Sequence, residues 1–214
     1  MGDRVSEVYF GDCMDYMKKL PDNFADLAVV DPPYQGSDAL NPVSSDSVYQ
    51  AKRTTYHLFE NVKSKPEYFI ELKRVSKHQI VWGGNFFGLS GGVIAWNKHG
   101  TAFGEGEIAI CSTHNSVRFF DYTWNGMIQQ NMKNKEQRIH PTQKPIALYE
   151  WTYMKYLPEG GIVLDTHLGS GSNRIAADKM GNIDFYSCEM DEEYFNGQEK
   201  RFENHKSQPS FNFL

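Results

Sequence analysis

Two apolar runs in this sequence end in residues that a buried strand does not require, and they limit how the chain can fold. Residues 27–30 run directly into Asp31-Pro32-Pro33-Tyr34, the Asp31 turn. Residues 162–164 run into Asp165 and a glycine-rich stretch that ends at Ser172, the glycine turn. Paired prolines cannot donate to a sheet ladder, so they predict a rigid, carbonyl-rich turn. Open α/β sheets bind ligands at the carboxyl ends of their strands, so the two turns predict one shared cleft.

Strand and helix patterns alternate at both ends of the chain. The pattern predicts strands at 7–10, 26–30, 79–82, 162–164 and 183–188, and helices at 13–20, 67–76, 145–157, 172–180 and 192–202. Strands that are joined through helices form a parallel sheet covered on both faces. The 214 residues fit a single domain, residues 1–214.

The middle of the chain has a different pattern. Strand-like runs at 93–96, 107–111 and 117–122 have no helices between them, which predicts antiparallel pairing. Two polar segments, 35–65 and 124–138, lack a regular pattern. Stretches of that length in a compact domain are usually functional or disordered. The fold class is therefore α/β, a mostly parallel sheet with an antiparallel edge.

Composition and charge exclude several classes of protein. A net charge of -5 does not suit a protein that coats nucleic acid nonspecifically, although a local basic surface is compatible with it. We find no basic segment followed by an apolar one at the start, and no run near about 18 apolar residues, so neither export nor a membrane partner is expected. Three scattered cysteines predict free thiols and a cytoplasmic location. The histidines form no cluster with ligand spacing, so no metal is expected.

The glycine turn predicts a cofactor site. Gly169 and Gly171 let backbone amides approach a ligand, and the following helix presents its positive end. Glu189 ends the next strand at roughly the 20-residue offset where a carboxylate receives ribose hydroxyls, with Asp191 as a competitor. The spacing is neither GxGxxG nor GxxxxGK[ST], which leaves S-adenosyl-L-methionine as the natural ligand. A turn without a ligand is the structural alternative.

With both turns in view, the chain resembles the beta class of amino-methylating DNA methyltransferases, which modify adenine N6 or cytosine N4. In that family D-P-P-Y precedes the cofactor turn, as it does here at Asp31 and Asp165. Further matches, in order, are Gly11-Asp12, Trp82-Gly83-Gly84-Asn85 and the hexapeptide His140-Pro141-Thr142-Gln143-Lys144-Pro145. The resemblance covers nearly the whole chain, from residue 8 to about residue 202. It implies a permuted Rossmann-like methyltransferase sheet, seven-stranded in the family.

The resemblance also implies the residues of the site, with the hexapeptide beside the methionine end of the cofactor. The expected catalytic residues are Asp31, Pro32, Pro33 and Tyr34. The residues expected to bind S-adenosyl-L-methionine are Asp12, Cys13, Asp31, Thr142, Lys144, Asp165, His167, Gly169, Ser170, Gly171, Ser172 and Glu189. For the hexapeptide, a proline-bounded helix entry with a solvated lysine is the alternative.

The Asp31 turn suits the chemistry of an exocyclic amino group, whose lone pair is delocalised into its ring. Asp31 can accept one amino hydrogen and the Pro32 carbonyl the other, which localises the lone pair for attack on a methyl group. Tyr34 offers a face for a base that is rotated out of the duplex. In this family Asp rather than Ser at the first position accompanies adenine, so the expected substrate is a flipped adenine in DNA.

Recognition of a target sequence is expected from residues 35–65 and 124–138. The second segment carries glutamine and asparagine, which suit adenine edges, and lysine and arginine, which suit phosphates; a plain solvated loop is the alternative. Since no large recognition domain fits, we expect a short target or low specificity, with a homodimer as one means of extending it. Cytosine N4 methylation, RNA or protein methylation, and a non-catalytic nucleic-acid-binding module are the competing functions. The intact Asp31 turn argues against the last.

Overall fold

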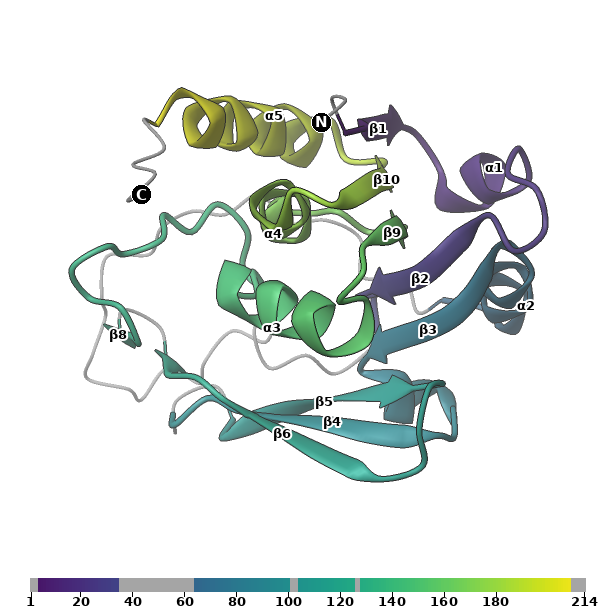
Figure 1. The fold of residues 1–214 in the computed structure, drawn as a ribbon, viewed down its shortest axis with the longest axis horizontal. Coiled ribbons are helices and arrows are strands. Elements are labelled where there is room, and N and C mark those ends of the chain that lie inside the picture. The colour runs from purple at the N-terminus through teal and green to yellow at the C-terminus, as the bar shows by residue number, and fades with distance from the viewer. Residues whose placement is uncertain (1–3, 35–63, 101–103, 126–127, 209–214) are drawn as a thin grey trace, which may run out of the picture.

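A computed structural model describes residues 4–34, 64–100, 104–125 and 128–208 (Figure 1). The main sheet contains eight strands in its described part: β1 (Ser6–Phe10), β2 (Ala25–Val30), β3 (Ser76–Trp82), β4 (Gly92–Asn97), β5 (Gly106–Cys111), β6 (Val117–Asp121), β9 (Gly161–Asp165) and β10 (Ile183–Glu189). A two-stranded ribbon pairs β7 (Trp124–Asn125) with β8 (Ile128–Gln129). The helices are α1 (Cys13–Met17), α2 (Pro66–Val75), α3 (Ile146–Tyr156), α4 (Ser172–Met180), α5 (Glu192–Ser207) and the 3-10 helix η1 (Gly84–Phe87).

The strand order in the main sheet is β1-β10-β9-β2-β3-β5-β4-β6. The five strands from β1 to β3 are parallel to one another, and β5 is antiparallel to both of its neighbours. The mostly parallel sheet with an antiparallel portion is therefore confirmed. It has eight strands in the described part rather than the seven expected.

One pairing differs from the prediction, because β6 runs parallel to β4. After β5 ends at Cys111, a short turn carries the chain past the start of β4, so that Val117 pairs with Val93. The turn crosses so closely that a side chain on Gly92 would lie 2.4 Å from the His114 carbonyl oxygen. The prediction of antiparallel pairing therefore holds for β4 and β5 but not for β6, which has no helix before it and still lies beside β4 in parallel.

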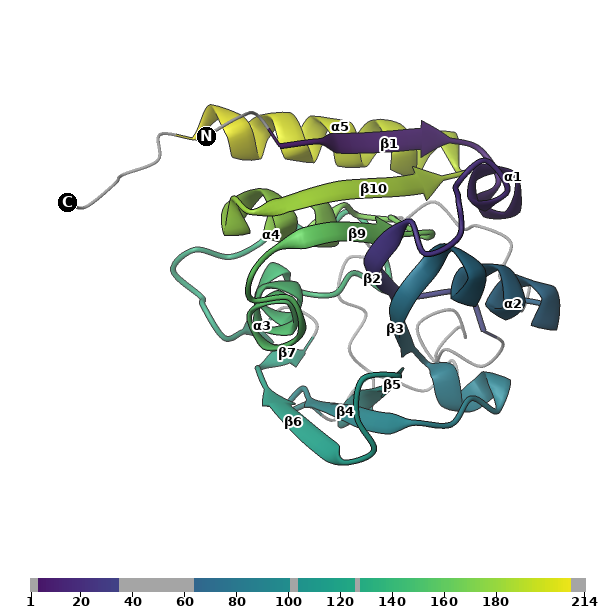
Figure 2. The same cartoon turned by 45° about the vertical axis from the view of Figure 1, so that its right-hand side comes forward.

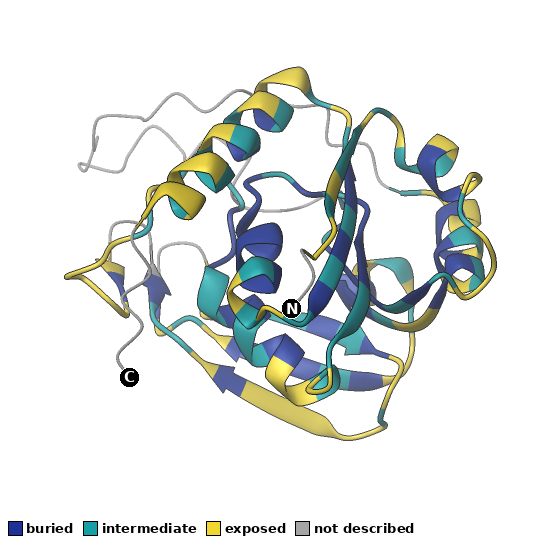
Figure 3. Ribbon diagram, turned by 45° about the horizontal axis from the view of Figure 1, so that its top comes forward, coloured by how far each residue is buried: buried dark blue, intermediate teal, exposed yellow. Residues whose placement is uncertain are grey.

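Helices cover both faces of the sheet (Figures 1 and 2). Along β2, Leu27 and Val29 pack in the core that contains α3 and α4, whereas Ala28 and Val30 pack in the core that contains α1 and α2. This alternation is the two-residue period of a strand that is buried on both sides. Figure 3 shows the buried residues on the central strands, and exposed residues along the outer sides of the helices.

Local sequence explains where the helices begin and end. Helix α4 spans the predicted residues and lies between Gly171 and Gly181, which have φ values of 74° and 71°. The side chain of Asp191 caps α5 by accepting hydrogen bonds from the amides of Glu193 (3.0 Å) and Tyr194 (3.1 Å). Helix α5 continues to Ser207, beyond the predicted end, and its last turn is tied to Asp178 by His205 (2.9 Å) and Lys206 (3.0 Å).

The described residues contain neither a membrane-spanning helix nor a cluster of metal-ligating side chains. None of their helices is both long enough and apolar enough to cross a membrane. The same residues contain no group of three or more His, Cys, Asp or Glu side chains placed to hold a metal ion.

Candidate active site

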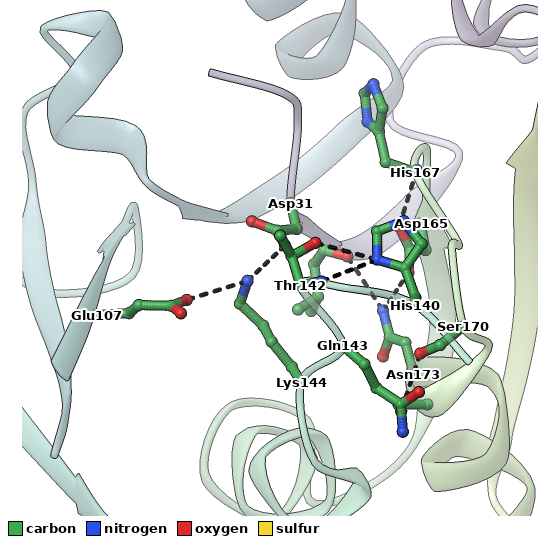
Figure 4. Close-up of polar contacts among 12 residues, drawn as sticks. Asp31, Glu107, His140, Thr142, Gln143, Lys144, Asp165, His167, Ser170 and Asn173 are labelled. Atoms are coloured by element: carbon green, nitrogen blue, oxygen red, sulfur yellow. Dashed lines mark hydrogen bonds and ion pairs between the residues drawn. The ribbon is translucent and has the colours of Figure 1, made fainter. Parts of the chain in front are cut away.

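The two predicted turns lie at the carboxyl ends of adjacent strands. Asp31 follows β2, Asp165 ends β9, and Glu189 ends β10, the next strand of the sheet. Gly11 follows β1, and its amide donates to the Glu189 carbonyl (3.0 Å). Figure 4 shows Asp31, Asp165 and the hexapeptide gathered at this edge. The sheet thus brings together residues that are far apart in the sequence.

A buried asparagine joins the ends of β2 and β9. The ladder between these strands contains two residue pairs, Leu27 with Val163 and Ala28 with Leu164. Just beyond it, the Asn173 amide donates both to the Val29 carbonyl (3.1 Å) and to Asp165 Oδ2 (2.8 Å). Sequence reasoning did not single out Asn173, and only its position directly after Ser172 could have drawn attention to it.

The Asp165 carboxylate accepts hydrogen bonds from groups of the protein itself. Its carboxylate is buried, and Oδ1 accepts a hydrogen bond from the His167 amide (3.0 Å). Burial raises the pKa of Asp165 to about 7, although the hydrogen bonds from Asn173 and His167 oppose the rise. His167 lies beside it, with Nδ1 at 2.9 Å from Thr166 Oγ1, and burial lowers its pKa to about 4. His167 is therefore neutral at pH 7.

The glycine turn is closed by Glu189. Oε2 of Glu189 accepts from the Gly169 amide (2.7 Å), and Oε1 accepts from the Asp191 amide (3.0 Å). Gly169 and Gly171 have φ values of 52° and 74°, in the left-handed region that favours glycine. Burial raises the pKa of Glu189, against the lowering effect of the backbone hydrogen bonds. The competitor, Asp191, caps α5.

Arg201 of α5 ties the glycine turn to a distant loop. Nη1 donates to the Ser170 carbonyl and to Ser172 Oγ, both at 2.8 Å. Nη2 pairs with Glu136 Oε2, also at 2.8 Å. Ser170 and Ser172 were expected to contact a cofactor, which stays a prediction; the structure shows them bound to Arg201. Sequence reasoning missed Arg201, which has no local motif around it.

The hexapeptide packs against the glycine turn through its histidine. A side chain on Gly169 would lie 3.6 Å from the His140 ring, and that ring packs on Tyr194 with centroids 4.3 Å apart. Thr142 Oγ1 lies 3.1 Å from His140 Nδ1. Burial, with Lys144 nearby, lowers the pKa of His140 to about 3, so the ring is neutral.

Lys144 is the link between the hexapeptide and the Asp31 turn. Its side chain is only 3% exposed, and the ammonium contacts Asp31 Oδ2 and, at 3.2 Å, Glu107 Oε2. The other oxygen, Asp31 Oδ1, is shielded from solvent and has no hydrogen-bond partner among the described residues. Lys144 was expected beside a cofactor; the structure places its ammonium on the carboxylate of Asp31.

The charges of this group shift one another. Burial raises the pKa of Asp31, and Lys144 opposes that rise. Burial alone would lower the pKa of Lys144, but Asp31 and Glu107 raise it well above its ordinary value. Burial also acts to raise the pKa of Glu107, but Lys144 and Lys98 bring it down to about 2. Sequence reasoning missed Glu107 and Lys98, which lie on and beside strands of ordinary pattern.

The Tyr34 ring, at the end of the Asp31 turn, is held in place by its neighbours. Its ring stacks on Phe86 of η1 with centroids 4.5 Å apart and planes 10° apart. Gly83, with φ at 64°, leaves room for the ring, because a side chain there would lie 2.5 Å from it. Pro32 is buried, and the Pro33 carbonyl accepts from the Ser64 amide (3.2 Å).

Asp12 and Cys13 lie at the start of α1. Asp12 is exposed, and its Oδ1 caps the helix by accepting from the amides of Met14 (2.8 Å) and Asp15 (3.2 Å). Burial, and then the charge of Asp12, raise the pKa of the Cys13 thiol to about 12. The thiol is therefore protonated at pH 7.

The second predicted recognition segment, 124–138, is folded on itself in its described part. Gln129 is buried; its side chain donates to the Glu136 carbonyl (2.9 Å) and accepts from the Glu136 amide (2.8 Å). The amide of Gln129 is thus committed inside the loop rather than offered to a base. Of the first predicted segment, 35–65, residues 35–63 lie outside the described residues.

The chain is similar to known proteins in family, sequence and fold. The model of the N6/N4 DNA methylase family, described as "DNA methylase", matches residues 76–200, more than half of the chain. The chain belongs to this family. Membership confirms the resemblance and makes DNA the substrate class, while the choice between adenine and cytosine stays open.

Relatives of the methylase agree with this placement. The type II methyltransferase M.HinfI of Haemophilus influenzae is 23% identical over 98% of this chain and 72% of its own length. Among solved structures, the complex of M1.HpyAVI with SAM has a TM-score of 0.59 and 19% identity, over 91% of this chain and 98% of its own. The cytosine-N4-specific PvuII DNA methyltransferase has a TM-score of 0.62 and 13% identity, over 94% and 89%. These structures share the fold.

Proposed function

We propose that the chain transfers the methyl group of S-adenosyl-L-methionine to the N6 amino group of adenine in DNA. The observation that carries the proposal is the state of Asp31. One of its oxygens is held by Lys144, and the other is shielded from water and free of partners among the described residues. A buried acceptor without a donor is costly, so its presence at a strand end is a reason to expect a donor from a ligand.

The carboxyl ends of β9 and β10 fit the cofactor. Gly169 and Gly171 adopt left-handed conformations that favour glycine, and the turn that they shape lies at the edge where open α/β sheets bind ligands. Glu189 would receive the ribose hydroxyls, and His140 and Thr142 would border the methionine end. When bound, S-adenosyl-L-methionine supplies a methyl group that is activated by its positively charged sulfur. The structure of a relative in complex with SAM supports this assignment.

The Asp31 turn would prepare the nucleophile. Asp31 Oδ1 accepts one amino hydrogen and the Pro32 carbonyl the other, so that the nitrogen lone pair is withdrawn from the ring and aimed at the methyl carbon. As the N–C bond would form and the methyl–sulfur bond break, positive charge would develop on the nitrogen beside the Asp31 carboxylate, and loss of one amino proton to solvent would leave the neutral methylated amine. Tyr34, held by Phe86, gives the flipped base a stacking surface worth about 1–3 kcal/mol.

Adenine is proposed because Asp31, rather than serine, heads the turn. Cytosine N4 is the second candidate, since a relative with the same fold is cytosine-N4-specific. Both bases present an exocyclic amino group to the same pair of acceptors. The homodimer and the cytoplasmic location remain predictions.

A labelling experiment tests the proposal. The protein is incubated with methyl-labelled S-adenosyl-L-methionine and, separately, DNA, RNA and peptide, and the digested products are identified by mass. We expect N6-methyladenine from DNA alone. N4-methylcytosine would transfer the proposal to the second candidate, and no label on any substrate would contradict it.

The same assay tests Asp31. We expect Asp31→Ala to lower kcat by at least about 100-fold, because it removes a group that acts on the developing charge. Cofactor affinity, measured by calorimetry, should change much less than kcat, because the remaining residues expected to bind the cofactor are intact. The control is Asp121→Ala, an exposed aspartate on the far edge strand β6, which should leave both quantities unchanged. Full activity of Asp31→Ala would remove Asp31 from its role.

A further inference from the structure

Four side chains of alternating charge lead from the Asp31 turn into the antiparallel part of the sheet. Lys144 contacts Asp31 and Glu107, and Glu107 in turn contacts Lys98. Their side chains are 19% (Asp31), 3% (Lys144), 26% (Glu107) and 12% (Lys98) exposed. Figure 4 shows Glu107, Lys144 and Asp31 in one line. The four residues, here called the charge chain, come from four separate segments.

Neutralising Asp31 requires only one cation, so the charge chain is longer than burial demands. Lys144 would suffice as a partner for Asp31, since a buried charge needs one opposite charge and satisfied hydrogen bonds. Glu107 Oε2 draws the same ammonium from the other side at 3.2 Å, and Lys98 balances Glu107. The ammonium is also over the Trp82 ring, 5.4 Å from its centroid, in an apolar wall. Lys144 is therefore divided between two carboxylates.

We infer that Glu107, balanced by Lys98, is a positioning residue for Asp31. Because Glu107 also attracts the Lys144 ammonium, the negative charge of Asp31 is less fully neutralised. Asp31 therefore acts more strongly on the amino group of the target base. It also fixes which oxygen Lys144 occupies, so that Oδ1 faces the substrate. The inference rests on the proposed function, because Asp31 is the group that it serves.

The sign of each substitution follows from the charges around Asp31. The charged and titratable groups that face it are Tyr34, Lys98, Glu107, Lys144, Tyr149 and Asp165. Among them Glu107 raises the pKa of Asp31, whereas Lys98 lowers it. Removing Glu107 leaves an excess positive charge and removing Lys98 leaves an excess negative one. Removing both restores the neutral pair of Asp31 and Lys144.

The test is the pH dependence of kcat for three variants and the wild type on DNA. Protonated Asp31 cannot accept an amino hydrogen, so kcat falls on the acid side. For Glu107→Gln we expect the acid limb of the kcat profile to move to lower pH by about half a pH unit or more. We also expect the plateau value of kcat to fall by about tenfold. For Lys98→Met we expect the acid limb to move to higher pH. The double variant should return the limb to within about 0.2 units of the wild type.

A second readout does not need catalysis. The Asp31 carboxyl is titrated by carbon-13 NMR in the free protein labelled at aspartate carboxyl carbons, and Asp31→Asn assigns its signal. The same opposite shifts and the same cancellation are expected. Thermal unfolding of each variant shows whether it is folded, and Lys98→Met tests the inference independently if Glu107→Gln does not fold.

The outcomes separate the inference from the proposed function. Opposite shifts that cancel in the double variant support the charge chain even if the wild type transfers no methyl group to DNA. Loss of kcat without movement of the acid limb or of the NMR titration would reduce Glu107 to a structural role and overturn the inference. Shifts of the same sign in both single variants would overturn it as well.

Discussion

Asp31 carries an asymmetry that a structural carboxylate does not need. Oδ2 is paired with Lys144, while Oδ1 is buried without a partner among the described residues. Leaving a buried acceptor unsatisfied costs about 1–3 kcal/mol. The folded protein carries this cost at the position where an amino hydrogen is expected, so substrate binding would recover free energy that folding does not.

At the residue scale, Gly83 offers the sharpest test of how Tyr34 is placed. In Gly83→Ala the new methyl group would lie 2.5 Å from the Tyr34 ring, at a φ of 64°. We expect the ring to move off Phe86 and kcat to fall by about tenfold or more, since stacking on a base is worth about 1–3 kcal/mol. Initial rates on DNA measure the loss.

The matched control for this prediction is Gly88→Ala. Gly88 has a similar φ of 70°, but a side chain there would meet nothing within 4 Å. It should share only the backbone strain, about 1–2 kcal/mol of stability in urea unfolding, and keep kcat within about twofold. Equal rates for the two variants would show that Tyr34 does not depend on the space at Gly83.

At the scale of elements, the ribbon formed by β7 and β8 depends on one buried amide. We expect Gln129→Ala to lower the free energy of unfolding by about 1–3 kcal/mol, because the backbone amide and carbonyl of Glu136 lose their partner. Gln130→Ala is the control: Gln130 is exposed and its Oε1 accepts one hydrogen bond, from the Thr123 amide. It should cost less than about 0.5 kcal/mol. Urea unfolding compares the two, and equal losses would contradict the assigned role.

Elements with strong local signals were predictable from the sequence. Helix α4 has glycine at both ends, and β2 and β9 are apolar runs that end in aspartate, so the positions of these elements and the shared edge of the two strands could be predicted. Residues whose partners come from distant parts of the sequence could not be predicted in this way. Glu107 lies in a strand of ordinary pattern, and only the pairing of β5 with β3 and the approach of the hexapeptide bring it to Lys144. Spacing along the chain does not encode such a contact.

At the scale of the whole molecule, the half-buried His167 couples stability to pH. The pKa of His167 is about 4 in the folded protein because of burial, below the ordinary value of 6.5. Between pH 6.5 and pH 4 the His167 ring binds a proton in the unfolded chain but stays neutral in the folded protein. The stability contribution is therefore complete above pH 6.5 and is lost as the pH falls toward 4.

In the difference between the wild type and His167→Gln, the contributions of the other titrating groups to the pH dependence of stability cancel. Relative to His167→Gln, the wild type should lose about 1.6 kcal/mol of unfolding free energy between pH 6.5 and pH 5. Denaturant unfolding of both proteins at a series of pH values measures the difference. A parallel curve for His167→Gln would show that the ring is protonated as readily in the folded protein as in the unfolded chain.

The short ladder between β2 and β9 has a mechanical consequence. It forms a seam between the strands that carry the glycine turn and those that carry the Asp31 turn, and beyond its two residue pairs the span is held by the side chain of Asn173. In the proposed function the methyl donor lies on one side of this seam and the acceptor on the other, so their spacing depends in part on the Asn173 amide. Loss of that amide would let the two sides of the site shift relative to each other, while the strand pairings on either side of the seam remain.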